Sequence, residues 1–260
     1  MHLFTHSVVL GHSNNLLSSL LKQRLIFNLL FAFIIILLSA CGSDKSEPQS
    51  ANTAISGYVI DGPVSDSSVT LHRVNADGTP GEQVAGPFTT DANGQWSGTV
   101  PESITGTLVV VATGGQYTDD ATSETITLAA DETLHSWFDP ASPDDYGVVS
   151  PITDSLWQVA QQQMSNGTTL VEAVATAQQL ATDFWGLDPT STVPDASSNT
   201  AANLRYGAIL GGYSFLMANR TELQQEPFVS MNRFTLTRLI MDDMSDGRLD
   251  GIGIDGSRLE

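Results

Sequence analysis

Hydrophobic and polar residues alternate along the chain between residues 55 and 138. In the run SSVTLHRV that starts at Ser67, Val69 and Leu71 would face one side of a strand and their polar neighbours the other. Clusters of Gly, Asn, Asp and Pro, such as residues 75–78, separate these runs at short intervals. The pattern predicts a β-sandwich of antiparallel strands over residues 55–138.

From Pro151 onward, apolar residues recur every three or four positions, which predicts an all-α region over residues 151–260. A first helix would place Leu156, Ala160 and Met164 on one side. The capping-box residues Thr169 and Glu172 start a second helix, which would form an antiparallel hairpin with the first.

The remaining segments complete an α+β chain of several domains. Residues 139–150 are rich in Pro and Asp and predict a linker between the sandwich and the helices. Two further helices are expected at residues 200–220 and 233–243, after a loop at 188–199.

A long apolar run lies near the N-terminus, at residues 25–41, directly after Lys22 and Arg24. A short basic segment, an apolar core and small residues at the end are the layout of a secretory signal. A transmembrane helix is the alternative, but a membrane span needs ~20 apolar residues. Asn28 interrupts the run and polar residues follow Cys41 at once, which favours the signal.

The end of that run, Leu38-Ser39-Ala40-Cys41, resembles the lipobox of bacterial lipoproteins. The resemblance implies that residues 1–40 are a signal peptide, that Cys41 is acylated, and that residues 41–54 form a flexible tether. The lipid bilayer would then be a partner, reached through the acyl chains on Cys41. Gly42, in place of the aspartate that favours retention in the inner membrane, implies the outer membrane of the cell envelope.

A second resemblance involves the sequence Thr90-Asp91-Ala92-Asn93-Gly94-Gln95-Trp96, which follows ISGYVIDGPV. It is similar to the hairpin of carboxypeptidase regulatory-like modules, small β-sandwiches that serve as spacers or binding platforms. Asp91 and Asn93 would bond the turn backbone, Gly94 would take a positive φ, and Trp96 would enter the core. A generic immunoglobulin-like sandwich is the alternative. The Asp-Gly segment near residue 250 also resembles a pattern in uncharacterised envelope lipoproteins of γ-proteobacteria.

The net charge and the few Cys and His residues exclude several classes of function. The chain carries 29 acidic against 10 basic residues, a net charge of −19, which excludes a nucleic-acid surface built on clustered Lys and Arg. With Cys41 acylated, no thiol is left for a disulfide or a thiolate nucleophile. His72 and His135 lie far apart in the sequence and are expected in solvated loops, although a two-histidine metal site stays open.

No motif of a serine hydrolase, zinc protease or nucleotide-binding enzyme occurs, so we expect no enzyme; only a pair of carboxylates for glycoside hydrolysis remains open. The expected function is that of a lipid-anchored cell-envelope protein, a non-catalytic binding or structural module whose envelope protein or glycan partner is unknown. The alternatives are a calcium-dependent adhesin or glycan-binding protein, and an accessory domain of an envelope hydrolase. Exposure of Trp96, Tyr117 or Trp137 would favour the glycan binder, and their burial a scaffold.

The C-terminal segment offers one candidate metal site. Asp242, Asp246 and Asp250 recur every four residues among glycines, and carboxylate oxygens on a bent loop suit Ca²⁺. The EF-hand template fits poorly, because Met244 and Gly253 fall at two of its ligand positions. A looser calcium loop and a solvated acidic turn both remain open.

A calcium site there predicts that millimolar Ca²⁺ raises the melting temperature of the protein, because the cation relieves carboxylate repulsion. The double change Asp246→Ala and Asp250→Ala should abolish that rise in a thermal melt. An equal rise in the wild type and the double variant would mean that calcium only screens the net charge.

Overall fold

The computed structural model describes residues 51–142, 146–195, 197–219, 239–240, 242–243 and 251–252. All of them belong to one compact unit, Ser50–Glu260. The expected signal peptide, the lipobox with Cys41, and the tether up to residue 50 lie outside the described residues.

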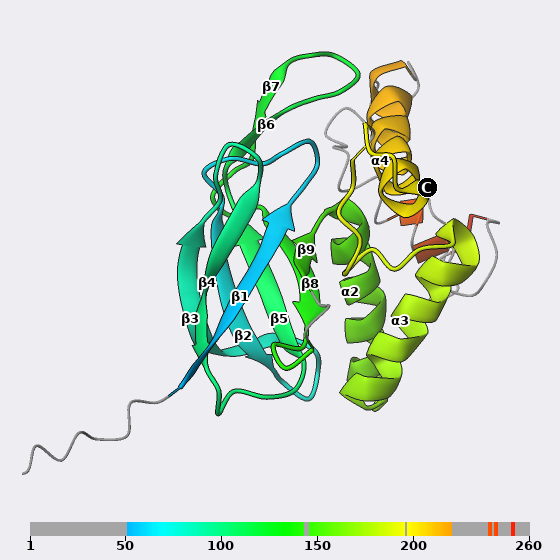
Figure 1. Cartoon of the computed structure of the whole chain (residues 1–260). Helices are drawn as coiled ribbons and strands as arrows, with labels where there is room; N and C mark the ends of the chain where they lie inside the picture. Colours follow the sequence, from blue (N-terminus) through cyan, green and yellow to red (C-terminus); the bar gives the residue numbers. More distant parts are fainter. Residues whose placement is uncertain are drawn as a thin grey trace, which may run out of the picture. The chain divides into compact units, whose positions relative to one another are not determined.

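Nine strands precede the helices and form three sheets (Figure 1). Their bounds are β1 Asn52–Val59, β2 Ser68–Val74, β3 Pro80–Thr89, β4 Gln95–Pro101, β5 Leu108–Thr113, β6 Gln116–Thr118, β7 Thr125–Thr127, β8 Thr133–Phe138 and β9 Gly147–Val149. One sheet has the order β4-β1-β9, a second β3-β2-β5-β8, and β6 pairs with β7. All pairs are antiparallel except β1 with β9, which is parallel. The prediction of a β region followed by helices is confirmed.

The two larger sheets contribute side chains to one core. Period-two alternation divides each strand: in β5, Leu108 and Val110 enter this core while Val109 faces a second core on the opposite side. Trp96 of β4 lies in the first core, 1% exposed, stacked on Phe88 with ring centroids 5.8 Å apart. The expectation that Trp96 is buried after the hairpin turn is therefore confirmed.

Two glycines make room for the Trp96 ring. Gly57 of β1 pairs with Trp96 on one side and with Gly147 of β9 on the other. A Cβ on Gly57 would lie 2.6 Å from Trp96 Cζ2 and 2.2 Å from the carbonyl oxygen of Gly147. The indole Nε1 donates a hydrogen bond to that same oxygen at 3.3 Å. The strand pairing of β1 with β4 and β9 thus depends on side chains being absent at both positions.

Strand β9 lies inside the segment that the sequence predicts to be a linker. Val148 and Val149 are fully buried, and they point into the second and the first core respectively. The local composition of residues 139–150 is that of a loop, but pairing with β1, almost ninety residues earlier in the chain, makes residues 147–149 a strand. A parallel neighbour so distant in sequence leaves no local signal.

Three described helices follow, α2 Pro151–Ser165, α3 Leu170–Trp185 and α4 Ala201–Asn219. The capping box of Thr169 and Glu172 is present at the start of α3, as predicted, and α2 and α3 pack side by side as the expected hairpin. Of the helix predicted at residues 233–243, only residues 239–240 and 242–243 are described, and they are helical. None of the described helices is long and apolar enough to cross a membrane.

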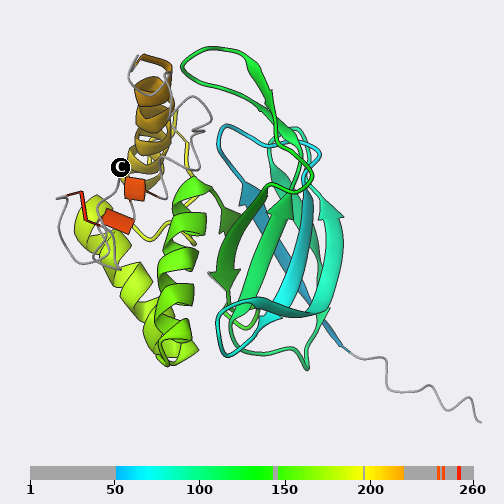
Figure 2. The ribbon, with the colours of Figure 1, turned by 180° about the vertical axis from the view of Figure 1, so that it is seen from behind.

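Helix α2 lies between the strands and α3, as the two opposite views show (Figures 1 and 2). Trp157 of α2 packs on Trp137 of β8, with ring centroids 5.9 Å apart, inside the second core. That core also takes Tyr206 and Leu210 from α4. The strands and helices therefore share buried apolar surface, the main stabilising contribution in folding.

The hairpin turn between β3 and β4 has the predicted chemistry. Asp91 Oδ1 accepts hydrogen bonds from the backbone amides of Asn93 and Gln95, and Gly94 has a φ of 73°. The expectation of solvated loop histidines is wrong, because His72 lies on β2 and His135 on β8, and both rings are half-buried and hydrogen-bonded.

The glycine contacts predict that Gly57→Ala lowers the free energy of unfolding by about 2–3 kcal/mol, because the added methyl group collides with Trp96 and with backbone. The control is Gly212→Ala in α4, where an added Cβ has nothing within 4 Å. It should raise stability slightly, since Ala favours a helix over Gly. Chemical denaturation measures both; equal effects of the two changes would contradict the packing of Trp96 described here.

Candidate functional site

The predicted calcium ligands fall mostly outside the described residues. Cys41, Asp246 and Asp250 are not described, and Asp242 lies in the short helical piece at residues 242–243. Its neighbour Asp243, which the sequence reasoning did not single out, is buried and accepts a hydrogen bond from the Gly251 amide at 2.8 Å. Within the described part of the chain, no group of three or more His, Cys, Asp or Glu side chains is placed to hold a metal ion. The calcium site stays a prediction.

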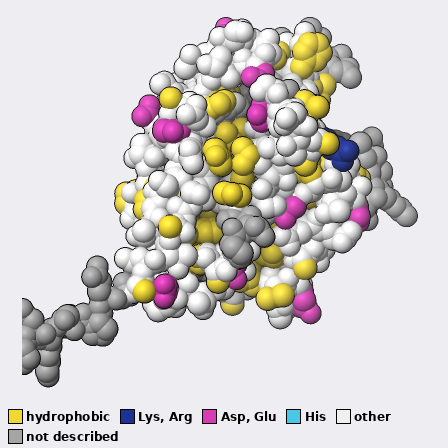
Figure 3. Space-filling view, viewed as in Figure 1, with side chains coloured by type: hydrophobic (Ala, Val, Ile, Leu, Met, Phe, Trp, Pro, Cys, Tyr) yellow, Lys and Arg dark blue, Asp and Glu magenta, His cyan; other side chains and the backbone are white. Residues whose placement is uncertain are grey.

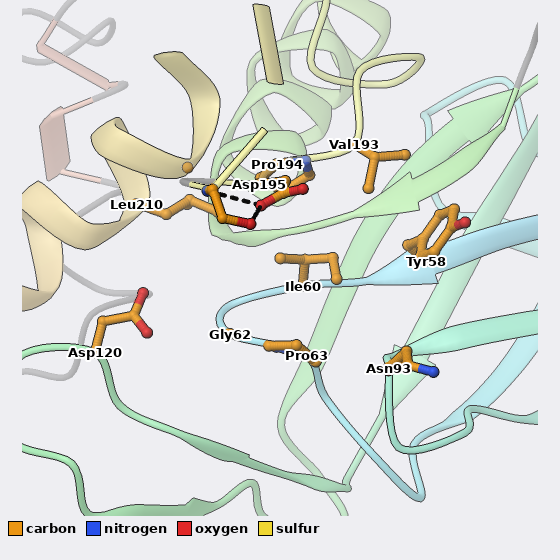
Figure 4. A pocket seen from close by; sticks show the side chains of 12 residues that line it. Tyr58, Ile60, Gly62, Pro63, Asn93, Asp120, Val193, Pro194, Asp195 and Leu210 are labelled. Atoms are coloured by element: carbon orange, nitrogen blue, oxygen red, sulfur yellow. Dashed lines mark hydrogen bonds between the residues drawn. The ribbon is translucent and has the colours of Figure 1, made fainter. Parts of the chain in front are cut away.

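A cavity of about 400 Å³ opens where the strands meet the helices (Figure 4). Its wall combines the β1–β2 turn, the β3–β4 turn, the tip of the β6–β7 hairpin, the α3–α4 loop and α4. The lining residues are Tyr58, Ile60, Gly62, Pro63, Asn93, Asp120, Val193, Pro194, Asp195, Ser197, Gly207 and Leu210. Its size is in the range of small-molecule sites.

Backbone hydrogen bonds hold these segments against one another. The Val59 amide donates to the Gly94 carbonyl oxygen at 2.8 Å, which joins the β1–β2 and β3–β4 turns. The Asp195 amide donates to the carbonyl oxygen of Asn203 at 3.0 Å, which ties the α3–α4 loop to the start of α4. The shape of the cavity therefore follows from main-chain contacts.

The β6–β7 hairpin reaches α4 through a carboxylate. Asp119 Oδ2 accepts a hydrogen bond from the Ser214 hydroxyl at 2.7 Å, and Oδ1 accepts from the amides of Ala121 and Thr122. This buried contact fixes the next residue, Asp120, at the edge of the cavity. Asp120 is exposed, and a Cβ on Gly211 of α4 would lie 3.9 Å from its Oδ2.

Asp195 is the second carboxylate of the lining. Its Oδ1 accepts hydrogen bonds from the Ser197 hydroxyl at 2.7 Å and the Ser197 amide at 2.8 Å. These bonds favour the ionised form and hold the pKa of Asp195 below its ordinary value. None of the described lining residues is a Lys, Arg or His. The cavity can therefore offer negative charge, hydrogen bonds and apolar surface.

One face of the molecule has a similar character. In the view of Figure 3, hydrophobic side chains gather near the middle of that face, acidic side chains lie around them, and Lys or Arg side chains appear at one place. A net charge of −19 concentrates cations near such a surface and repels anions.

Below the cavity, a buried polar cluster joins the strands to the helices. Ser150, which follows β9, caps α2 by accepting hydrogen bonds from the amides of Ile152 and Thr153, and its hydroxyl also bonds the Tyr206 hydroxyl of α4. Burial raises the pKa of Tyr206, and the negative charges of Asp188 and Asp61 act in the same direction, while the bond to Ser150 opposes them.

Asp154 connects the first turn of α2 to β8. Its carboxylate, 1% exposed, accepts hydrogen bonds from the His135 amide at 3.0 Å, from His135 Nδ1 at 2.8 Å and from Gln158 Nε2 at 2.9 Å. A carboxylate in the first turn also interacts favourably with the helix dipole. Sequence reasoning missed this pair, because no local pattern relates residue 135 to residue 154.

The three aromatic residues proposed as a sugar-binding surface are all buried. Trp96, Trp137 and Tyr117 are 1%, 3% and 5% exposed. Exposed aromatic rings would have favoured a glycan-binding surface, so their burial favours a scaffold role for the sheet faces. Tyr58, half-buried in the cavity wall, was not singled out from the sequence.

Comparison of the chain with protein-family models, curated proteins and solved structures finds no match.

The buried cluster predicts the response of stability to alkaline pH. Tyr206 ionises at a higher pH in the folded protein than in the unfolded chain, so its contribution is complete below about pH 10 and is lost as pH rises further. Tyr206→Phe should lower the free energy of unfolding by about 1 kcal/mol at pH 7. It should also flatten the decline above pH 10, measured by denaturant unfolding at several pH values. Parallel declines in variant and wild type would contradict this role.

Proposed function

We propose that this chain is a lipid-anchored protein of the bacterial cell envelope and acts there as a non-catalytic binding module. In this proposal Cys41 carries the acyl chains at the outer membrane. Residues 55–138 form a sandwich of the carboxypeptidase regulatory-like type, and β9 completes one of its sheets. The helices are attached to this platform through α2.

The cavity between the β turns and the α3–α4 loop is the observation that supports a binding role. Five segments from different parts of the chain form it. Hydrogen bonds among buried residues join the β1–β2 turn to the β3–β4 turn and the β6–β7 hairpin to α4. The described lining has carboxylates, an amide and hydroxyls over an apolar floor. A few polar groups over apolar surface are typical of a site that recognises a ligand.

Burial of Trp96, Trp137 and Tyr117 weighs against the alternative of a glycan-binding adhesin that uses the sheet faces. The shared core of the two larger sheets supports the sandwich, since inward residues of both sheets interdigitate in that architecture.

The anchor predicts that a radioactive fatty acid such as palmitate labels the wild-type protein in cells and that Cys41→Ser abolishes the label. Only the thiol of Cys41 can form the thioether in this chain, because it has one cysteine. Ser39→Ala is the control and should be labelled like the wild type. Equal labelling of Cys41→Ser would refute the anchor.

A further inference from the structure

We infer that the cavity binds an organic cation, an ammonium group carried on an apolar chain. This inference deepens the binding role proposed above and rests on it. Among the described lining residues, the floor and the rim of the cavity differ in chemistry.

The floor is apolar. Ile60 and Leu210 are buried, and Val193 packs against the second core. The pyrrolidine rings of Pro63 and Pro194 add apolar surface and restrict the backbone there. Figure 4 shows Val193, Pro194 and Asp195 on the loop opposite the turn that carries Ile60, Gly62 and Pro63. A methylene chain placed between them would remove from water the apolar surface that Pro63 and Val193 still expose, at about 25 cal/mol per Å².

The rim is acidic. Asp120 and Asp195 come from separate elements, the β6–β7 hairpin and the α3–α4 loop. Asp195 uses Oδ1 for Ser197, so its Oδ2 can accept from a ligand. Anionic ligands are disfavoured, because the described lining residues include two carboxylates and no basic side chain.

A neutral polyol would use the hydrogen bonds of the rim but not its charge. An alkylammonium uses both, because its NH₃⁺ group donates to a carboxylate such as that of Asp195 while its chain covers the floor. Asn93 and Tyr58 also line the cavity. The same chemistry occurs in a free diamine and in the side chain of a lysine in a peptide, so the test includes both.

The test is calorimetric titration of the full chain, in a neutral detergent, with 1,5-diaminopentane and separately with N-acetyl-lysine amide. The first result expected is saturable binding of at least one of these amines and none of 1,5-pentanediol. Binding of the diamine alone assigns a free diamine, and binding of the lysine compound assigns a peptide side chain. Binding of the diol as strongly as the amines would overturn the proposal.

Asp195→Asn should weaken binding by about fivefold to tenfold, the loss expected for one charge near 4 Å in a partly solvated site. Asp120→Asn should weaken it by less, because Asp120 lies beside Gly211 of α4, about two helical turns beyond Asn203, which binds Asp195. Asn keeps the size of the side chain and also supports the turn at Ser197. The matched control is Glu102→Gln, an equal loss of charge at an exposed residue beside the first residues of β1, the opposite end of that strand from the cavity. Unchanged melting temperatures verify that all three variants fold.

The proposal is wrong if Glu102→Gln weakens binding as much as the cavity variants, because the cation then responds to net charge alone. It is also wrong if neither amine binds. If no amine binds but Cys41 is acylated, the proposal of an ammonium ligand is refuted and the proposal of an envelope anchor still stands.

Discussion

The hydroxyl of Ser150, at the junction of β9 and α2, caps one helix and binds a second one. The amides in the first turn of α2 have no partner within the helix and are buried, so their desolvation must be offset by a cap. The same oxygen bonds Tyr206, which brings α4 to the start of α2. Ser150 directly follows β9, and Val148 of that strand packs in the core that the helices share, so separation of the capped helix from the sheet would expose Val148. Removal of this hydroxyl would therefore affect strand, helix and cavity together.

This connection explains why the cavity exists at this position. Helix α2 covers the strands, and α4 is held to α2 through Tyr206 and to the β6–β7 hairpin through Ser214. The α3–α4 loop has to cross between these fixed points, beside the β1–β2 turn. The Val148 amide donates to the Thr190 carbonyl oxygen at 3.4 Å, so the loop contacts β9 as it passes. The space that remains between loop and turn is bounded by rigid elements, which is the usual condition for a preformed site.

Periodicity was sufficient to predict the β region, the helical hairpin, its capping box and α4, because each depends on residues close in sequence. It was insufficient for β9 and for the pairs His135–Asp154 and Ser150–Tyr206, which join positions 19 and 56 residues apart. The Pro and Asp residues near position 140 correctly indicate a turn, but local composition does not show that the next three residues find a parallel partner in β1. The cavity escaped prediction for the same reason, since its wall comes from five segments. A possible signal was the repeated turn chemistry of Gly62-Pro63 and Pro194-Asp195, which occurs in two loops that meet.

Two of the acidic residues, Asp120 and Asp195, line the cavity and differ from most other carboxylates of the chain. Most carboxylates on a protein of net charge −19 repel one another and are solvated, which says little about function. Asp195 differs, because hydrogen bonds from Ser197 stabilise its charge and fix its orientation. Asp120 differs for another reason: the buried contact of Asp119 with Ser214 determines where it lies. A carboxylate that is already oriented loses less conformational entropy when a cation binds than one on a mobile side chain. Negative charge held in place over an apolar floor therefore distinguishes this site from the acidic surface around it.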